Sequence, residues 1–260
     1  MSIVTTKLMG GIGNYLFQIA SSYAYSLKYD KKFICGTADI QSPHNNYTLY
    51  LNNILRKVEF SNSVPNYIHY VEPNFSYNKI PNFDSDIKLI GYFQSEKYFL
   101  EYKKEILELF EIDPETSEYI SEKYSNILNL DNCSLHVRRG DFVNLQNFHA
   151  LQTIEYYKKS VDIIGEDKFY LIFSDDIDWC RENLSFIKNK TFITENPDYI
   201  DLYIMSLCKN NIIANSTFSW WGAWLNSNPN KKIVIPSKWF GINNLHLNTI
   251  DLYCDKWIKL

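Results

Sequence analysis

Short apolar runs alternate with segments of helical periodicity along most of the chain. In the first half, β-rich apolar runs lie at 3–7, 33–35 and 87–92. Helical spacing follows at 15–27, 95–110 and 114–128. Asp113 and Pro114 are cap and first-turn signals for the last of these helices. Residues 37–86 are interrupted by prolines and predict only short strands and loops.

The second half repeats this alternation more regularly. Its strand-like runs lie at 133–137, 169–173, 191–193, 212–214 and 232–235. Its helical segments lie at 153–164, 198–208 and 218–225. Strands that alternate with helices indicate α/β units around parallel sheets. We therefore predict two α/β domains, residues 1–130 and 131–260, and leave open whether the last residues pack back on the first domain.

Polar clusters follow three of the predicted strands in the second half, each just beyond the carboxyl end of its strand. They are Arg138–Arg139, Ser174–Asp176 and Asn215–Ser219. In open α/β sheets, ligands bind at the edge where the carboxyl ends of the strands meet. The three clusters together therefore predict one ligand site at this edge.

The arginine pair suits a diphosphate group. Guanidinium groups bind phosphate oxygens in pairs and keep their charge at physiological pH. The chain has a formal net charge of -4, so the pair at Arg138 and Arg139 is a local feature. The alternative is an ordinary solvated pair of surface arginines.

The cluster at Asn215 has two interpretations. Ser216, Thr217, Phe218 and Ser219 open a predicted helix, where hydroxyl and backbone N–H groups can form an anion site. Asparagine and serine also cap ordinary helices, so simple capping is the alternative.

The acidic cluster also has two interpretations. A carboxylate such as Asp175 or Asp176 can accept two parallel hydrogen bonds from guanine, or it can cap the helix near Trp179. Asp176 to Asp178 and Asp84 to Asp86 spell D-x-D, a signature of divalent-metal sites. We discount both, because the arginine pair already supplies the positive charge that a metal would bring.

A glycine-rich stretch, GGIGN at 10–14, follows the first predicted strand. It fails as a dinucleotide fingerprint, because the third glycine of that pattern would fall on Leu16. It predicts a tight turn that allows close backbone approach to something bound between the two halves, or a purely structural turn.

Composition describes a soluble globular protein. Hydrophobic residues make up 45% and charged residues 22% of the 260 positions. The sequence pI of about 5.8 and the lack of a basic stripe argue against a nucleic-acid partner. The five cysteines are scattered, which favours reduced thiols in a cytoplasmic compartment. No apolar run is long enough to span a bilayer, no leader peptide is evident, and any membrane contact is expected to be peripheral.

Five segments resemble the α-1,2-fucosyltransferases of glycosyltransferase family 11. They are LMGGIGNYLFQIA (8–20), GYFQSEKYF (91–99), HVRRGD (136–141), FSDD (173–176) and NSTFSWWGAWLN (215–226). HVRRGD also resembles a motif of α-1,6- and protein O-fucosyltransferases, whereas NSTFSWW with the opening glycine motif is specific to the family. Tyr15 and Ile19 depart from it, since the family usually has Gln and Tyr at these positions.

The resemblance implies a GT-B architecture, in which two Rossmann-like domains face each other across a cleft. It implies GDP-β-L-fucose as donor substrate, inversion at the anomeric carbon, and no cofactor or metal. The C-terminal domain would bind the donor, with Arg138 and Arg139 at the diphosphate and His136 and Asp176 at the guanosine. Ser216 to Ser219 would contact the phosphates and fucose.

On the same basis, the N-terminal domain would lie on the acceptor side, and the acceptor would be a galactose-terminated oligosaccharide. Further candidate donor contacts are Gly11, Gly13, Asn14, Ser174, Asp175 and Asn215. Candidate acceptor contacts are Gln18, Gln94 and Trp220. The heavy use of Asn, Lys, Ile and Tyr hints at a bacterial or viral source.

An inverting transfer needs a base near the acceptor hydroxyl. Asp141 and His149 are the candidates, and His149 matches a histidine position of the family. Asp141 can instead orient the arginines. Leaving-group stabilisation can also supply most of the rate without a strong base.

Three other functions compete with this interpretation. The chain can transfer a different GDP-sugar or form a different linkage, or it can be a non-catalytic glycan-binding protein. A dinucleotide-dependent oxidoreductase is disfavoured by the missing glycine. The sequence does not indicate an oligomeric state.

Overall fold

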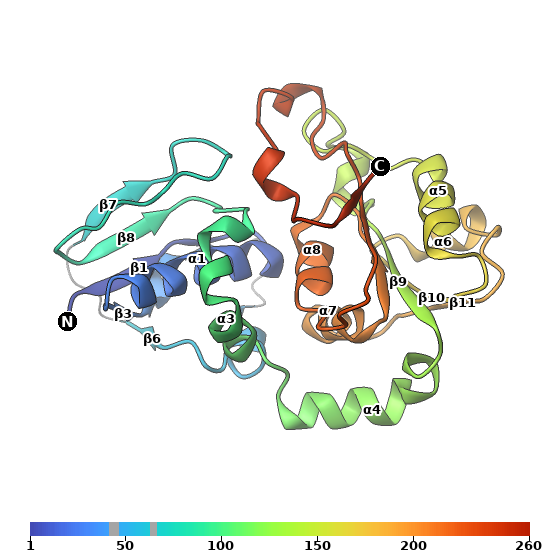
Figure 1. Cartoon of the computed structure of the whole chain (residues 1–260), viewed down its shortest axis with the longest axis horizontal. Helices are drawn as coiled ribbons and strands as arrows, with labels where there is room; N and C mark the ends of the chain where they lie inside the picture. Colours follow the sequence, from blue (N-terminus) through green and yellow to red (C-terminus); the bar gives the residue numbers. More distant parts are fainter. Residues whose placement is uncertain (42–46, 63–66) are drawn as a thin grey trace. The chain divides into compact units, whose positions relative to one another are not determined.

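A computed structural model describes residues 1–41, 47–62 and 67–260. The chain divides into two compact units (Figure 1). The first contains Met1–Asp113 and Asn248–Cys254, and the second contains Pro114–Leu247 and Asp255–Leu260.

Helix α4 (Pro114–Leu128) belongs to the second unit, although we placed the boundary at residue 130. The hydroxyl of Tyr124 on α4 lies 3.1 Å from Oδ1 of Asn196, which precedes helix α7 (Asp198–Leu207). Asn132, at the start of the next strand, donates to the carbonyl oxygens of Ile127 and Leu128. The contact between Tyr124 and Asn196 joins residues far apart in the sequence, which a local sequence pattern does not encode, and it ties α4 to the second unit.

The described part of the first unit is built on a parallel sheet in the order β3-β1-β8-β7. Its strands are β1 (Ile3–Thr6), β3 (Lys32–Phe33), β8 (Ile87–Ile90) and β7 (Ile68–Val71). Smaller parallel pairs join β2 (Leu8–Met9) to β5 (Ile40–Gln41), and β4 (Cys35–Gly36) to β6 (Phe60–Ser61). The helices are α1 (Ile12–Lys28), α2 (Tyr47–Leu51) and α3 (Lys103–Leu109). Two parts of the predicted loop region, 42–46 and 63–66, lie outside the described residues.

Helix α1 begins at Ile12, inside the glycine-rich stretch. Gly10 has a φ of 87°, a left-handed conformation that suits glycine, and so the chain turns within one residue. The N–H groups of Asn14 and Tyr15 then donate to the carbonyl of Gly11. Tyr15 and Ile19, the two departures from the family pattern, are fully buried in α1.

The continuous helix that we predicted over 95–110 is wrong. Two 3-10 turns, Glu96–Tyr98 and Leu100–Tyr102, precede α3. Phe99 separates them with φ -137° and ψ 0°, and its buried ring packs near Phe17 of α1. Packing of Phe99 therefore accompanies the break in the helix at this point.

All residues of the second unit are described, and its sheet is parallel throughout in the order β11-β10-β9-β12-β13-β14. Its strands are β9 (Asn132–Val137), β10 (Phe169–Ser174), β11 (Lys190–Phe192), β12 (Asn210–Ile212), β13 (Ile233–Ile235) and β14 (Ile258–Lys259). The helices after α4 are α5 (Ile154–Ile164), α6 (Ile177–Asn183), α7 and α8 (Thr217–Trp224). In chain order the strands run 3-2-1-4-5-6, the order of nucleotide-binding sheets, whose switch point lies between strands 1 and 4. The switch point here lies between β9 and β12.

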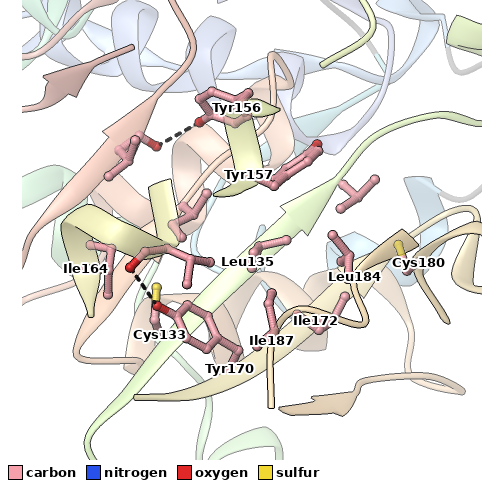
Figure 2. Close-up of a cluster of buried hydrophobic side chains, with 14 residues drawn as sticks. Cys133, Leu135, Tyr156, Tyr157, Ile164, Tyr170, Ile172, Cys180, Leu184 and Ile187 are labelled. Carbon is pink, nitrogen blue, oxygen red and sulfur yellow. Dashed lines mark hydrogen bonds between the residues drawn. The ribbon is translucent and has the colours of Figure 1, made fainter. Parts of the chain in front are cut away.

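The sequence of β9, NCSLHV, presents a different kind of residue to each face of the sheet. Cys133, Leu135 and Val137 join residues of α5 and α6 in an apolar core (Figure 2). Ser134 and His136 point to the opposite face and are also buried. A buried polar face on a central strand is unusual, and it places His136 beneath the carboxyl edge of the sheet.

Tyrosine hydroxyls in this core are bonded to the backbone. Tyr156 donates to the carbonyl of Ile213 at 2.6 Å, and Tyr170 donates to that of Gly165 at 2.8 Å. Figure 2 shows both side chains within the cluster. These hydrogen bonds link α5 and β10 to neighbouring loops and satisfy the two buried hydroxyl groups.

The five cysteines are all buried, and none forms a disulfide. Burial raises the pKa of Cys133 and of Cys208. The thiols of this chain therefore pack as small apolar groups.

Among the described helices, none combines the length and apolar character needed to cross a membrane.

Candidate functional site

The sheet of the second unit brings the predicted clusters to one edge. Strands β9 and β10 are paired so that Val137 lies opposite Ser174, and Leu135 lies opposite Ile212 of β12. The segments that follow these three strands therefore leave the sheet side by side. The arginine pair follows β9, the acidic pair follows β10, and the Asn215 segment follows β12.

Arg138 is held by two carboxylates. Its Nη2 donates to Oδ1 of Asp141 at 2.6 Å, and its Nη1 lies 2.8 Å from Oδ2 of Asp175. Gly140 makes the second contact possible, because a Cβ atom there would lie 2.5 Å from the same Asp175 oxygen. The guanidinium carbon of Arg138 also lies 5.3 Å from the centre of the Phe142 ring.

Arg139 is held by the same acidic segment but keeps part of its guanidinium group available. Its backbone N–H donates to Asp175 at 2.8 Å, and its Nε donates to Asp176 at 3.0 Å. Its guanidinium carbon lies 4.3 Å from the centre of the Trp179 ring, within cation–π range. Among the described residues, Nη1 and Nη2 of Arg139 make no hydrogen bond, so they are available to a ligand.

The two arginines of this cluster are outnumbered by its three carboxylates, so the cluster carries a net negative formal charge. Nη1 and Nη2 of Arg138 both contact carboxylates, so an anionic ligand that binds them in the same way would replace one of these carboxylates. The Asp141 side chain is 55% exposed, against 26% for Asp175 and 33% for Asp176. Asp141 is the carboxylate that can leave at the smallest cost in lost contacts.

Asp176 also caps a helix. Its Oδ1 accepts from the N–H of Trp179 in the first turn of α6, and its own N–H donates to Oγ of Ser174 at 2.9 Å. Asp176 therefore caps α6, as one of the two interpretations expected, but it also binds Arg139, and Asp175 makes no cap among the described residues. The oxygens of Asp175 and Asp176 bind the arginines and this backbone, and Asp178, the other end of the D-x-D pattern, pairs with Arg181 at 2.8 Å. Within the described ranges, no three His, Cys, Asp or Glu side chains are grouped as metal ligands.

Helix α8 presents an N-terminus that no side chain caps. Ser216 occupies the N-cap position with extended φ and ψ, but its hydroxyl makes no capping bond. Ser216, Thr217 and Phe218 are partly exposed, whereas Ser219 is buried. The simple capping interpretation of this segment is wrong, and the backbone N–H groups of the first turn keep their capacity to bind an anion.

His136 lies under the same edge, next to α8. Its ring centre is 5.5 Å from that of Phe218 in an edge-to-face arrangement. Burial and, to a smaller extent, the nearby charge of Arg138 together lower the pKa of His136 to about 3. The imidazole is therefore neutral at physiological pH, and its Nδ1 is buried with no hydrogen-bond partner among the described residues.

His149 lies in the same cluster as Arg138 and Asp141. Its imidazole stacks on the ring of Phe142, with centres 4.2 Å apart and planes 7° apart. Its backbone donates to Leu145, and an antiparallel bridge joins it to Phe240. Burial lowers the pKa of His149, the charge of Asp141 opposes this shift, and the charge of Arg138 adds to it.

The Asn215 side chain forms hydrogen bonds with two loops around the site. Its Nδ2 donates to the carbonyls of Ala150 and Trp239, both at 2.8 Å, and its Oδ1 accepts from Gln152 at 3.0 Å. The side chain is buried. Asn215 therefore positions the loop that carries His149 relative to the end of β12.

The remaining candidates have structural contacts. In the first unit, Gln94 donates to Asn14 at 3.0 Å, and Gln18 is fully buried with its Oε1 bound to the backbone of Met9. In the second unit, Trp220 is fully buried in contact with other tryptophans. In this structure, Gln18 and Trp220 present no side-chain surface to an acceptor, and we assign both to packing. Gly11 is exposed at the N-cap of α1, and Gly13 is buried in its first turn.

Sequence reasoning did not identify roles for Phe142 and Trp179, the aromatic partners of the two arginines. Each lies close in sequence to a candidate carboxylate, Phe142 directly after Asp141 and Trp179 in the helix that Asp176 caps. An aromatic residue near an arginine-binding carboxylate is the signal that would have suggested them.

A family model described as Glycosyl transferase family 11 matches residues 1–260. The chain is 32% identical over 296 residues to an alpha-1,2-colitosyltransferase of Escherichia coli, with 100% of this chain and 99% of that protein covered. It is 30% identical over 304 residues to the O-antigen biosynthesis glycosyltransferase WbnK of Escherichia coli, with 97% and 99% covered.

Among solved structures, the α-1,6-fucosyltransferase NodZ co-crystallized with GDP matches with a TM-score of 0.57 at 12% identity. The match covers 85% of this chain and 92% of that one. At this identity the likeness concerns the fold, and it confirms the GT-B type of α/β architecture expected from the sequence.

Proposed function

Because the chain belongs to glycosyl transferase family 11, and is therefore a glycosyltransferase, we propose that it uses GDP-β-L-fucose as its donor. The acceptor is the 2-hydroxyl of a terminal β-galactose on an oligosaccharide or glycan precursor. The product is an α-1,2-linked fucoside, formed with inversion at the anomeric carbon.

One observation carries the donor assignment. Arg138 and Arg139 are fixed by Asp175 and Asp176 at the carboxyl edge of a sheet with nucleotide-binding strand order, beside the uncapped N-terminus of α8. Guanidinium groups and free helix N–H groups are both suited to a diphosphate. The free Nη atoms of Arg139 are the first available donors, and Arg138 joins them when Asp141 releases it.

In the proposed reaction, the acceptor oxygen attacks C1 of fucose while the bond from C1 to the β-phosphate oxygen breaks. The electron pair of that bond passes to the departing GDP, whose growing negative charge the two arginines stabilise. The proton of the acceptor hydroxyl passes to His149, which is neutral because its pKa lies below the ordinary value. No metal or cofactor takes part.

We assign different tasks to the two candidates for the base. The carboxylate of Asp141 is bound to Arg138 at 2.6 Å, which supports an orienting role. His149 lies beside this pair and is half-buried, which supports the role of base. We place the guanosine of the donor at His136 and Asp176, where Asp176 exchanges its bond with Arg139 for the base edge of guanine.

The donor sugar has a second candidate besides fucose. One relative, identical at 32% over the whole chain, is named as a colitosyltransferase, and colitose is L-fucose without its 3-hydroxyl group. Transfer of colitose from GDP-colitose is therefore the second candidate function. Both reactions use the same arginines, so they differ only in contacts to the sugar.

A donor and acceptor screen tests the proposal. The full-length chain is incubated with GDP-fucose or GDP-colitose and a panel of β-galactosides, and the linkage of the product is determined by NMR. We expect turnover with GDP-fucose and an α-1,2 linkage. Turnover with GDP-colitose alone would identify GDP-colitose as the donor instead. A linkage other than α-1,2 would show that a different acceptor hydroxyl reacts. Oligosaccharide binding without any transfer would indicate a glycan-binding protein.

A further inference from the structure

The ring of Phe142 contacts two groups that the proposed reaction places at opposite ends of the breaking and forming bonds. The guanidinium of Arg138 lies 5.3 Å from its centre, and the imidazole of His149 stacks on it at 4.2 Å. The interplanar angle with His149 is 7°, so these two rings are nearly parallel. Phe142 itself is buried.

Short backbone bonds hold the segment that carries this ring. The N–H of Val143 donates to Arg139, and the N–H of Leu145 donates to Phe142. The N–H of His149 donates to Leu145 in turn. The ring and the two polar groups that contact it therefore belong to one segment, residues 138–149, which these backbone hydrogen bonds hold together.

The contacts of this ring go beyond the filling of apolar space. An aliphatic side chain of similar size would fill the same volume but would offer no flat face to the imidazole and no π-system to the guanidinium. A phenylalanine side chain also has only two rotatable bonds, so packing holds its position closely.

We propose that Phe142 is a positioning residue that sets the separation between Arg138, which holds the leaving diphosphate, and His149, which receives the acceptor proton. This inference rests on the proposed function. Phe142 does not touch the reacting atoms and acts through the two residues on its ring. Loss of the ring lowers the rate of transfer more than it weakens donor binding, because donor binding retains Arg139 and the N-terminus of α8.

The substitution Phe142→Leu tests this role, with Phe142→Tyr as the variant that keeps the ring. Phe186→Leu is the control, because Phe186 is a partly buried phenylalanine that likewise has a cation, Lys158, 5.7 Å from its ring centre. We expect kcat to fall roughly 10- to 100-fold in Phe142→Leu with little change in the donor KM, as for a small misplacement of reacting groups. Phe142→Tyr and Phe186→Leu should stay close to wild type.

A double-mutant cycle separates positioning from general loss of stability. If Phe142 acts through His149, then Phe142→Leu added to His149→Gln lowers kcat by no more than about twofold, because the group that it positions is already gone. Equal losses in the two backgrounds would overturn the inference, as would equal losses in Phe142→Leu and Phe186→Leu.

Proton NMR of the histidines gives a readout that does not depend on transfer. The His149 signals are identified by their loss in His149→Gln. In Phe142→Leu these signals should lose the ring-current shift of the stacked phenyl group, and the pKa of His149 should rise, since burial is the main cause of its lowering. Asp141 and Arg138 are the charged groups that act on His149, and both remain in this variant.

The outcomes distinguish this inference from the proposed function. If wild type transfers sugar but Phe142→Leu does so equally well, the inference fails and the proposed function stands. If wild type transfers no GDP-sugar, both fail. Unchanged His149 signals in Phe142→Leu would overturn the stacked arrangement itself.

Discussion

The Nη1 atom of Arg138 lies 2.8 Å from Oδ2 of Asp175, and the two residues follow the adjacent parallel strands β9 and β10. Sheet pairing, rather than closeness in sequence, thus holds the arginine in place. Together with Asp141 on its other side, Asp175 keeps the guanidinium oriented toward the carboxyl edge of the sheet. Our central claim is that this edge binds the diphosphate of a GDP-sugar.

Removal of the Asp141 charge should tighten GDP binding. Asp141→Asn frees Arg138 from the most exposed of its carboxylates, and the loss of one exposed ion pair changes affinity by roughly two- to fivefold. Titration calorimetry with GDP measures the change. Asp178→Asn is the matched control, since Asp178 also pairs with an arginine three residues away at 2.8 Å. Weaker GDP binding in Asp141→Asn would mean that Asp141 only supports Arg138 and does not compete with phosphate.

The pH dependence of transfer should report His149. Its pKa lies below the ordinary 6.5, so the imidazole is neutral at and above that pH and becomes protonated only as the pH falls through the lowered value. The profile of kcat/KM for the donor reports the free enzyme and should therefore lose activity only below pH 6.5.

The variant His149→Gln should lower kcat roughly 100-fold or more, and its pH profile should no longer show the loss of activity at acidic pH. If the loss of activity at acidic pH persists unchanged in His149→Gln, the group that titrates, and acts as base, is another one such as Asp141.

Transfer should survive removal of divalent cations. Arg138 and Arg139 supply the positive charge at the diphosphate, so EDTA should leave the rate within about twofold of the untreated enzyme. The rate of GDP release in the presence and absence of EDTA measures this. Reversible loss of activity, restored by Mg²⁺ or Mn²⁺, would give Asp176 and Asp178 a metal-binding role and contradict our discount of the D-x-D pattern.

The stability of the second unit should depend on Asp201 of α7. Burial raises the pKa of Asp201 to about 7, Asp198 adds to the shift, and the bond from Asn196 opposes it. In the unfolded chain its pKa is about 3.9, so the folded state binds more protons between about pH 4 and pH 7, and stability is lost as the pH rises through that range.

Asp201→Asn keeps an oxygen for Asn196 but has no charge to bury. Its Tm should exceed that of wild type by more at pH 8 than at pH 5. Asp162→Asn, at an exposed position of α5, is the control and should show no such difference. An equal change in Tm at both pH values would contradict the burial of a charged Asp201.

Much of the site was predictable from the sequence because it depends on local patterns. Apolar runs identified β9 and β10 to within one residue of their observed bounds, whereas β12 begins and ends two residues before the run at 212–214. The rule for parallel sheets placed the residues after these strands on one edge. The polar character of Arg138–Arg139 and Ser216–Ser219 then suggested an anion. No tertiary information was needed for these steps.

The contacts within the site were less predictable, because they depend on register and packing. The sequence suggested guanine as a partner of Asp175 or Asp176 but did not indicate that both carboxylates hold the arginines and that Asp176 also caps α6. The bond from Asn215, a predicted donor contact, to the loop at Ala150 was likewise not indicated by the sequence. Side-chain choices of this kind follow from distances across strands, which periodicity does not contain.

Calorimetric titration of GDP into Arg139→Ala, Arg138→Ala and Arg181→Ala tests the central claim most directly. Arg181 is the control, because it also pairs with an aspartate and lies 5.7 Å from an aromatic ring centre, that of Phe192. Our account predicts that Arg139→Ala weakens GDP binding roughly 30-fold or more, from the loss of about 2 kcal/mol of charge-assisted hydrogen bonding, and that Arg138→Ala also weakens it. Arg181→Ala should bind GDP as wild type does. GDP binding of wild-type strength in both Arg138→Ala and Arg139→Ala would contradict the assignment of this sheet edge to the donor.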